Sequence, residues 1–428
     1  MKKLTISRSN ELWERAIKVI PSGTQTLSKG PDQFIRGVSP KYLVKGKGCH
    51  VWDIDGNEFI DYPMALGPIL LGYDYPAVTK AAIKQIHMGT AFTLMHPVEV
   101  ELAELLTEVI PCAEMVRFGK NGVDATSAAI RCARAYTGKD HIAYCGYHGY
   151  QDWYCAIHVR NKGVPVILRD FMHEFKYNDI SSLERLFNEN HGKIGAVIME
   201  QPGTEPQNNF LQKVKDVAHK NNAVFIMDEI VTGFRYSLGG AQELYKVVPD
   251  LAAFGKGMAN GFPLSAVVGK KEIMKTFDEI FFSTTYGGET VSIAASIATI
   301  KTMRKKDVVG HIWKQGKKLR NGLCKIIEGL KIDLKISGNP PRSGFEFQEQ
   351  KGISASQIKS LFLQETIKRG VLFGGPVFIT FSHKDKDIQK TLDASHNALN
   401  VVKKALDENN IAKYMEGEFI GDIFRKRD

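Results

Sequence analysis

The stretch Leu251-Ala-Ala-Phe-Gly-Lys-Gly-Met-Ala-Asn-Gly-Phe-Pro-Leu264 places a single lysine, Lys256, between two glycines and among apolar residues. Glycines on both sides let the backbone turn tightly and leave room for a flat molecule to approach. Apolar surroundings lower the pKa of a lysine and keep part of it as the neutral, nucleophilic amine. Such an amine can form a Schiff base with a carbonyl compound. A turn with a solvated lysine is the alternative, because glycine and lysine are both common in loops.

Short apolar runs separated by helical segments surround this stretch along the chain. We expect buried strands at residues 115–118, 142–145, 194–199, 223–227, 251–254 and 264–268, and helices at residues 98–110 and 125–136. Apolar runs of this length, with helices between them, are typical of a mostly parallel sheet that is covered on both faces. The sequence therefore predicts an α/β fold.

The two ends of the chain show other patterns. Residues 10–19 predict a short amphipathic helix, and Asp55-Gly56-Asn57 predicts the turn of a hairpin in an N-terminal arm. From residue 301 onward a helix, polar strands and a second helix indicate a smaller α+β domain. We therefore expect an N-terminal segment at residues 1–74, a large domain at 75–305 and a small C-terminal domain at 306–428.

The composition argues against several functional classes. The 428 residues carry 57 Lys and Arg against 47 Asp and Glu, a formal charge of +10, without an arginine-rich segment or a nucleic-acid motif. The six cysteines are widely spaced and lack a CxxC pair, which argues against a zinc site and for a reducing compartment. The first residues lack the apolar core of a signal peptide, and no apolar run could span a bilayer. We therefore expect a cytoplasmic protein without metal, membrane or nucleic-acid partners.

Polar residues follow several of the expected strands, at the place where open α/β sheets bind their ligands. In Phe118-Gly-Lys-Asn-Gly-Val-Asp-Ala125 a glycine-containing turn leads from a strand into a helix. The backbone N–H groups of Asn121, Gly122 and Val123 would face a phosphate there and add the positive end of the helix dipole. An ordinary strand-to-helix loop with Asp124 in the first helical turn would look the same.

Three further features fall at strand ends. Tyr147 and His148 follow the strand at 142–145 and offer an aromatic ring that could stack on a flat molecule; packing residues are the alternative. Asp228 ends the strand at 223–227, and a buried carboxylate requires a cation, such as a protonated pyridine nitrogen or a metal. Lys256 follows the next strand. A phosphate turn, an aromatic ring, an aspartate and a lysine together indicate a pyridoxal phosphate site.

Two motifs carry a family resemblance. Asp228-Glu-Ile-Val-Thr-Gly-Phe-Arg235, followed by Pro249-Asp-Leu-Ala-Ala-Phe-Gly-Lys-Gly257, resembles the fold-type I, class III aminotransferases that depend on pyridoxal phosphate. Over residues 11–406 the chain is similar to the glutamate-1-semialdehyde 2,1-aminomutase branch of that family. The resemblance implies a large domain with a mostly parallel seven-stranded sheet, a smaller C-terminal α+β domain and an N-terminal arm. It also implies a homodimer with a shared active site.

The resemblance further implies a role for each matching residue. Lys256 would bond pyridoxal phosphate covalently and later move a proton, and Asp228 would pair with the pyridine nitrogen; these two are the expected catalytic residues. Thr285 would reach the phosphate of the neighbouring subunit, Ile230 would pack behind the ring and Glu200 would order the pocket. The expected cofactor-binding residues are Asn121, Gly122, Val123, Tyr147, His148, Glu200, Asp228, Ile230, Lys256 and Thr285.

Three departures from the family pattern bear on the substrate. The phosphate turn reads Asn121-Gly-Val-Asp124 and lacks the threonine hydroxyl of the family's Ser-Gly-Thr-Glu. The segment Phe373-Gly-Gly-Pro-Val-Phe-Ile-Thr-Phe-Ser-His383 lacks the glutamate that the aminomutases carry there. The segment Tyr147-His-Gly-Tyr-Gln-Asp-Trp-Tyr154 carries three extra aromatics, and a flat or sugar-like substrate would suit such a wall.

We therefore expect an aminotransferase that moves an amino group from an amino acid donor to a carbonyl acceptor, with a sugar or small polyol as the candidate acceptor. Glutamate-1-semialdehyde 2,1-aminomutase is the alternative within the same chemistry. A basic binding protein on the same scaffold, without catalysis, is the alternative outside it.

Overall fold

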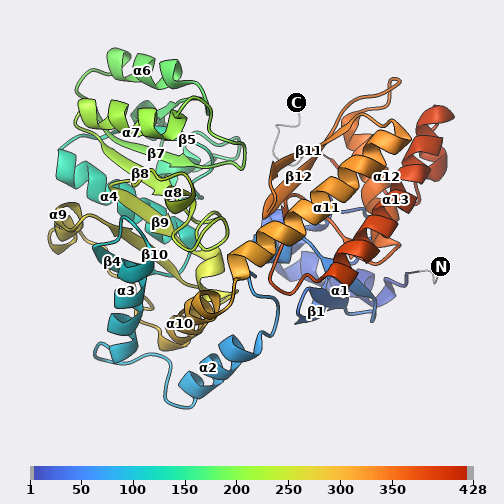
Figure 1. The fold of residues 1–428 in the computed structure, drawn as a ribbon, viewed down its shortest axis with the longest axis horizontal. Coiled ribbons are helices and arrows are strands. Elements are labelled where there is room, and N and C mark those ends of the chain that lie inside the picture. Colours follow the sequence, from blue (N-terminus) through green and yellow to red (C-terminus); the bar gives the residue numbers. More distant parts are fainter. Residues whose placement is uncertain (1–3, 422–428) are drawn as a thin grey trace. The chain divides into compact units, whose positions relative to one another are not determined.

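The computed structural model describes residues 4–421 and divides into two compact units (Figure 1). The inner unit comprises Pro76–Val309. The outer unit joins the chain before residue 76 to the chain after residue 309. The domain boundaries that the sequence suggested after residues 74 and 305 stay predictions. In the described residues, no helix combines the length and the apolar composition that a membrane span requires.

The inner unit is built on a seven-stranded sheet. Its strands, in spatial order, are β4 (Met115–Gly119), β10 (Ser265–Gly269), β9 (Leu251–Phe254), β8 (Val224–Asp228), β7 (Ile194–Glu200), β5 (His141–Cys145) and β6 (Met172–Glu174). β10 pairs antiparallel with both of its neighbours, and the remaining pairs are parallel. The mostly parallel seven-stranded sheet of an α/β fold is thereby confirmed, and each strand expected from an apolar run is present within one or two residues.

Both faces of this sheet are covered by helices, which explains why its strands are apolar without alternation. In β8, Ile226 packs toward α4 (Gly122–Thr137), whereas Phe225 and Met227 pack on the opposite face toward α6 (Ile180–Glu189) and α7 (Phe210–Lys220). Figure 1 shows α6 and α7 together on one side of the strands. The other helices of this unit are α2 (Pro76–Ile86), α3 (Pro97–Val109), α5 (Asp152–Cys155), α8 (Ala241–Leu244), α9 (Lys271–Met274) and α10 (Thr290–Lys305).

Helix α4 starts earlier than the expected residue 125. The carboxylate of Asp124 accepts hydrogen bonds from the backbone N–H groups of Lys120 and Asn121, each at 2.8 Å. Such a carboxylate satisfies donors that a helix leaves unpaired at its start, so the first turn forms at Gly122. The helix ends where Gly138 takes a φ of 66°, the left-handed conformation typical of a helix C-terminus.

The outer unit contains two smaller sheets. The first has the order β1-β2-β3-β13, and the second has the order β11-β12-β14. The hairpin expected as an arm pairs in parallel with β13 through Ile60 and Val371, and Phe59 and Ile60 are fully buried. The helices and strands of the outer unit are α1 (Ser7–Val19), β1 (Leu43–Lys47), β2 (His50–Asp53), β3 (Glu58–Asp61), α11 (Val308–Leu330), β11 (Leu334–Asn339), β12 (Arg342–Phe347), α12 (Ala355–Ile367), β13 (Val371–Leu372), β14 (Val377–Phe378) and α13 (Asp385–Asp407). The boundary between the units falls inside α11, which belongs to the outer unit from Gly310 onward.

Candidate active site

Six strands of the inner unit end at the same edge of the sheet. They run in one direction, so their carboxyl ends lie together, and the reversed β10 starts at this edge; the six are β4, β5, β6, β7, β8 and β9. The expected site residues that end or follow these strands are Asn121, Gly122 and Val123 after β4, Tyr147 and His148 after β5, Glu200 in β7, Asp228 in β8 with Ile230 after it, and Lys256 after β9. The topology therefore gathers nine of the ten expected residues at one edge.

Asp228 is held by an imidazole as well as by the backbone. Its Oδ2 lies 2.8 Å from Nδ1 of His148, and its Oδ1 accepts a 3.0 Å hydrogen bond from the backbone N–H of Ile230. The His148 side chain is fully buried and that of Asp228 is 4% exposed. The Nε2 of His148 is buried without a hydrogen-bond partner in the described residues. Because the Asp228 carboxylate accepts at Nδ1, this ring nitrogen carries a proton.

His148 was expected to contact the cofactor, but the structure shows it bonded to Asp228. The loop that carries it is fixed to α4, since Thr126 Oγ1 donates a 2.9 Å hydrogen bond to the backbone oxygen of His148. Gly149 brings this loop close to α4: its φ is 122°, and a Cβ there would lie 2.2 Å from Cγ1 of Val123. A side chain at residue 149 would therefore push the loop and the imidazole away from the helix.

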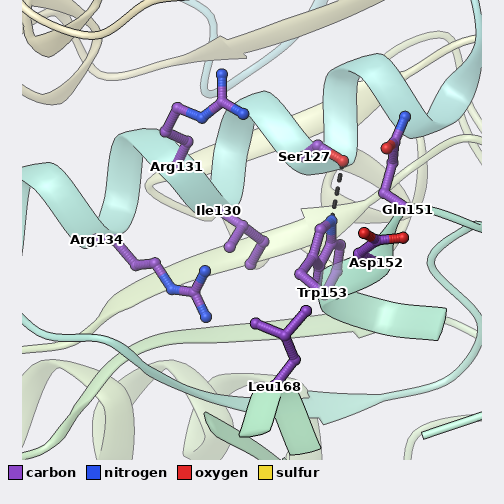
Figure 2. Close-up of a pocket in the computed structure, with 8 residues that line it drawn as sticks. All are labelled: Ser127, Ile130, Arg131, Arg134, Gln151, Asp152, Trp153 and Leu168. Atoms are coloured by element: carbon purple, nitrogen blue, oxygen red, sulfur yellow. Dashed lines mark hydrogen bonds between the residues drawn. The ribbon is translucent and has the colours of Figure 1, made fainter. Parts of the chain in front are cut away.

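Two of the extra aromatics expected to face a substrate are packing residues. The Trp153 ring stacks on His148 at a centroid distance of 6.5 Å, and its Nε1 donates to Ser127 Oγ at 2.9 Å. Tyr154 is buried, and its hydroxyl donates to the backbone oxygen of Gly146 at 2.8 Å. Figure 2 shows the Trp153–Ser127 bond at the wall of a cavity of about 290 Å³. The residues lining this cavity are Ser127, Ile130, Arg131, Arg134, Gln151, Asp152, Trp153 and Leu168.

The Ile230 side chain lies between the turn that follows β4 and the loop that carries Lys256. A Cβ added to Gly122 or to Gly255 would in each case meet the Ile230 side chain at 3.1 Å. Both glycines therefore lie directly against Ile230, and neither has a side chain that would fill the space between them. Lys256 follows Gly255 with a φ of 39°. A lysine in this left-handed conformation is strained by about 1–3 kcal/mol, and such strain concentrates at functional sites.

The turn after β4 offers fewer amide donors than the sequence suggested. The N–H of Asn121 donates to Asp124, as described for the start of α4. Gly122 and Val123 are the first two residues of α4, and N–H groups at these positions have no partner within a helix. Ser265 adds a donor that the sequence did not indicate, because its hydroxyl is buried without a partner in the described residues. A Cβ on Gly119, in the same turn, would lie 2.9 Å from that hydroxyl oxygen.

The remaining expected residues differ in exposure. Tyr147 is 60% exposed, and burial of its hydroxyl end raises the phenol pKa, with negative charge on Cys155, Tyr150 and Asp228 raising it further. Glu200 is paired in register with Asp228 across β7 and β8.

Thr285 is exposed and lies in the loop before α10. Lys120 forms an ion pair with Glu289 at 2.8 Å, which ties the phosphate turn to the start of α10.

Glu229, next to Asp228, has a structural role. Its buried carboxylate accepts hydrogen bonds from the Thr232 hydroxyl and from the backbone N–H groups of Ala241 and Gln242, at 2.8 and 2.9 Å. Burial raises the pKa of Glu229. Glu229 accepts three hydrogen bonds from the residues that follow it, whereas Asp228 accepts two of the about four that a carboxylate can accept.

These features fit pyridoxal phosphate. Asp228 offers a buried anion for the pyridine nitrogen, while Gly122, Val123 and Ser265 offer donors for the phosphate. Gly122 and Gly255 both lie against Ile230, where a side chain at either position would crowd it. Lys256 directly follows Gly255 in the chain.

Comparison with known proteins identifies the family. Residues 36–399 match the profile of the family described as aminotransferase class-III. The chain is 35% identical over 416 residues to the 3-aminobutyryl-CoA aminotransferase of Cloacimonas acidaminovorans, which covers 94% of this chain and 99% of that relative. It is 32% identical over 427 residues to the glutamate-1-semialdehyde 2,1-aminomutase of Methanothermobacter thermautotrophicus, and the match covers 92% of this chain and 100% of that relative.

Solved structures agree with this assignment. The FumI protein of Sphingopyxis sp. MTA144, in its PLP internal aldimine form, superposes with a TM-score of 0.87 at 27% identity, covering 94% of this chain and 97% of that one. A transaminase with PLP bound superposes with the same TM-score of 0.87 at 23% identity, which shows the fold. The chain therefore belongs to the class III aminotransferases, fold-type I enzymes that depend on pyridoxal phosphate.

Proposed function

We propose that the chain transfers an amino group from an amino acid donor to a carbonyl acceptor, with Lys256 and Asp228 as its catalytic residues. The observation that supports this most directly is the buried Asp228–His148 pair at the strand edge where Lys256 also lies. A buried carboxylate that keeps its charge needs donors and a cation. The imidazole and the backbone supply the donors, and the pyridine nitrogen would supply the cation.

Several residues would hold the cofactor. Gly122 and Val123 would donate their amides to the phosphate at the positive end of α4, and Ser265 would add its hydroxyl. Ile230 would support one face of the ring, and Tyr147 would cover the other. Glu200 would order the pocket beside Asp228, its partner in register.

Pyridoxal phosphate, when bound, supplies an aldehyde that carries the amino group and a ring that withdraws electrons from the substrate carbon. Asp228 would keep the ring nitrogen protonated, because a fixed negative charge at a buried site favours a cation beside it. His148 would keep Asp228 ionised and oriented. The free Lys256 amine would act as the general base that removes a proton from the substrate carbon and as the acid that gives it back.

A lysine substitution tests this role. Lys256→Ala should abolish transfer and leave the cofactor removable by dialysis, while the thermal unfolding midpoint of the protein stays within a few degrees. Lys271→Ala, at an exposed lysine of the same unit, is the matched control and should keep full activity and a bound cofactor. If Lys256→Ala protein still transferred amino groups, this assignment would be wrong.

We consider two classes of compound as the carbonyl acceptor. A sugar or small polyol carbonyl is supported by Tyr147 and Tyr150, which are 60% and 64% exposed, whereas Trp153 and Tyr154 pack inward and no longer support it. A 3-oxoacyl thioester is the second candidate, because the relative at 35% identity is named for 3-aminobutyryl-CoA. A panel of keto-sugars and 3-oxobutyryl thioesters, offered to the amino form of the enzyme, should regenerate the aldehyde absorption with one class only.

Aminotransferase activity is proposed in preference to aminomutase activity because residues 373–383 contain no carboxylate. An aminomutase isomerises glutamate-1-semialdehyde without a second substrate. Incubation of the cofactor-loaded protein with the semialdehyde alone should therefore release no 5-aminolevulinate. A basic binding protein without catalysis would show neither the absorption of a lysine-bound cofactor nor its change on borohydride treatment.

We also propose a homodimer with a shared site, in which Thr285 reaches the phosphate of the neighbouring copy. Large apolar side chains near this loop are exposed in the single chain, among them Met95 (84%), Phe281 (82%) and Tyr286 (59%). They flank a cavity of about 440 Å³ lined by parts of 95–104, 116–118 and 282–288. Exposed apolar surface around a cavity is typical of a protein interface.

Light scattering should therefore give twice the mass of one chain. Thr285→Val should weaken cofactor binding about tenfold through a lost hydrogen bond to a charged group, and Thr284→Val should not. A cytoplasmic location stays a proposal, supported by the six free cysteines, all of which lie within the described residues.

A further inference from the structure

Three metal-ligating side chains gather in the outer unit. Cys49 lies between β1 and β2, His50 begins β2, and Asp387 lies in the first turn of α13. The Cys49 sulfur, a ring nitrogen of His50 and a carboxylate oxygen of Asp387 all lie within 4.8 Å of one another. Donor atoms around a tetrahedral zinc ion are about 3.3–3.7 Å apart, given bonds of about 2.0–2.3 Å. Small side-chain movements would therefore bring the three donors onto one ion.

The carboxylate of Asp387 is already oriented toward this point. Its Oδ2 accepts a 3.0 Å hydrogen bond from the backbone N–H of Lys384 at the start of α13. Its Oδ1 lies 3.1 Å from Nε2 of His50. Since one oxygen is fixed by the helix start, the other is directed at the imidazole and the thiol. Asp387 is 5% exposed and Cys49 is 1% exposed, so a charge placed between them would be shielded from water.

The second ring nitrogen of His50 also lies beside a carboxylate, although it forms no hydrogen bond in the described residues. Nδ1 lies 2.8 Å from Oε1 of Glu58 on the neighbouring strand β3. Histidines that bind metals almost always direct their other ring nitrogen to a carboxylate, a backbone carbonyl or water, which fixes the tautomer and makes the ligating nitrogen a better donor. His50 therefore has the surroundings of a ligand that would bind through Nε2.

We propose that Cys49, His50 and Asp387 bind one zinc ion. A thiolate, an imidazole and a carboxylate are the three zinc ligands in proteins, whereas magnesium and calcium require oxygen donors alone. The Cys49 sulfur lies within 4.8 Å of an Asp387 carboxylate oxygen, and the thiol proton must leave before this sulfur can bind an ion. Zinc binding replaces this proton: the S–H bond breaks, an S–Zn bond forms and the proton goes to solvent. His50 binds as the neutral ring, and a water fills the fourth position on the side where His50 is 23% exposed.

The ion would join distant parts of the chain. Residues 50 and 387 are separated by 337 positions, and the three ligands link the first sheet of the outer unit to α13. The sequence suggested no metal because zinc sites are found by close spacing, and here only Cys49 and His50 are neighbours. The proposal is independent of the aminotransferase activity, so its test does not use turnover.

The test measures metal content and stability of the full-length, cofactor-loaded protein. After chelator treatment and equilibrium dialysis against zinc, we expect one tightly bound ion per chain and a higher thermal unfolding midpoint. Cobalt in place of zinc should give thiolate-dependent d–d absorption at wavelengths longer than those at which the cofactor absorbs. Cys49→Ser and Asp387→Asn should each lose the bound ion and the stabilisation, and Glu58→Gln should weaken binding about 10–100-fold.

Cys324→Ser and Asp393→Asn are matched controls in the same unit, and both should bind zinc as the unsubstituted protein does. If Asp387→Asn does not fold, Cys49→Ser decides, because serine is nearly the same size as cysteine. Substoichiometric zinc binding by the unsubstituted protein would overturn the proposal. Equal zinc content in Cys49→Ser and the unsubstituted protein would overturn it as well, since the ion would then lie elsewhere.

Discussion

Each unit holds a histidine–aspartate pair at its candidate ligand site, and these two pairs differ in what surrounds them. In the inner unit, His148 and Asp228 are 2.8 Å apart with side chains 0% and 4% exposed. In the outer unit, His50 and Asp387 are 3.1 Å apart, and His50 is 23% exposed. Neither Nε2 of His148 nor Nδ1 of His50 has a hydrogen-bond partner in the described residues, although Nδ1 of His50 lies 2.8 Å from Oε1 of Glu58.

The difference shows how the same two residue types serve different chemistry. His148 has one carboxylate, so it leaves Asp228 with a net negative charge that can balance a cationic ring. His50 has two carboxylates and a thiol around it, so that group of side chains can balance a doubly charged ion. The number of anions around each imidazole, rather than the pair itself, indicates the charge of the expected ligand.

The largest contrast is expected when each aspartate is changed. Asp228→Asn should lower the transfer rate about 10³-fold or more, because it removes the charge that stabilises the protonated ring. Asp387→Asn, the same change in the other pair, should leave the rate within a few-fold. Single-turnover absorption measurements on both variants check this. Equal losses of rate in the two variants would contradict the separate roles.

Changes to the imidazole should have smaller effects. His148→Leu should lower kcat about 10–100-fold, since Asp228 loses the N–H that orients it. His148→Asn places an amide N–H near the position of Nδ1 and should restore part of the rate. His50→Asn is the control and should leave kcat unchanged. If His148→Asn were no better than His148→Leu, the imidazole would act through packing alone.

A glycine near each histidine, Gly149 beside His148 and Gly48 two residues before His50, sharpens the comparison through stability. Gly149→Ala should lower the free energy of unfolding by about 2–3 kcal/mol, because its φ is 122° and the new Cβ would lie 2.2 Å from Val123. Gly48→Ala, with a φ of 62° and its nearest neighbour at 3.6 Å, should lower it by only about 1 kcal/mol. Urea unfolding of both variants measures the two values. A smaller effect at residue 149 would show that the loop relaxes without strain.

A contact between two imidazoles, those of His141 and His173, should make the stability of the protein depend on pH. Nδ1 of His141 and Nε2 of His173 are 2.8 Å apart, and burial lowers the pKa of both from 6.5, with Lys193 lowering them further. A lowered pKa means that the folded state binds protons less readily than the unfolded state. The stability from this contact is therefore present above pH 6.5 and lost as the pH falls through the lowered values.

Thermal unfolding from about pH 7.5 to 5.5 should show this loss, which spans the ordinary titration range of histidine. His173→Asn should weaken the dependence, whereas His87→Asn, at an exposed histidine, should preserve it. An unchanged pH profile in His173→Asn would assign the acid sensitivity to other groups.

The strands of the inner unit could be predicted because each one is a short apolar run. The location of the candidate site could be predicted because parallel strands end at one edge of a sheet. The reversed direction of β10 could not be predicted, since an apolar run such as residues 265–269 carries no directional signal. The partner of Asp228 was also missed: His148 lies 80 residues away, and its role depends on a distance. The roles of Lys256, Tyr147 and Thr285 stay predictions. Trp153 and Tyr154 were placed in the substrate wall because sequence does not show which way a ring turns.

The pairing of β3 with β13 has a consequence for how the protein is made. Ile60 pairs with Val371, so the first sheet of the outer unit lacks its last strand until the ribosome has passed the entire inner unit. At about 5–20 residues per second, the roughly 300 intervening residues take about 15–60 s to synthesise. During that time the edge of β3 is open on the nascent chain while the inner unit can already fold. Residues translated before the inner unit are thus among the last to reach their final partners, and that interval is when chaperones or premature pairing would act on this chain.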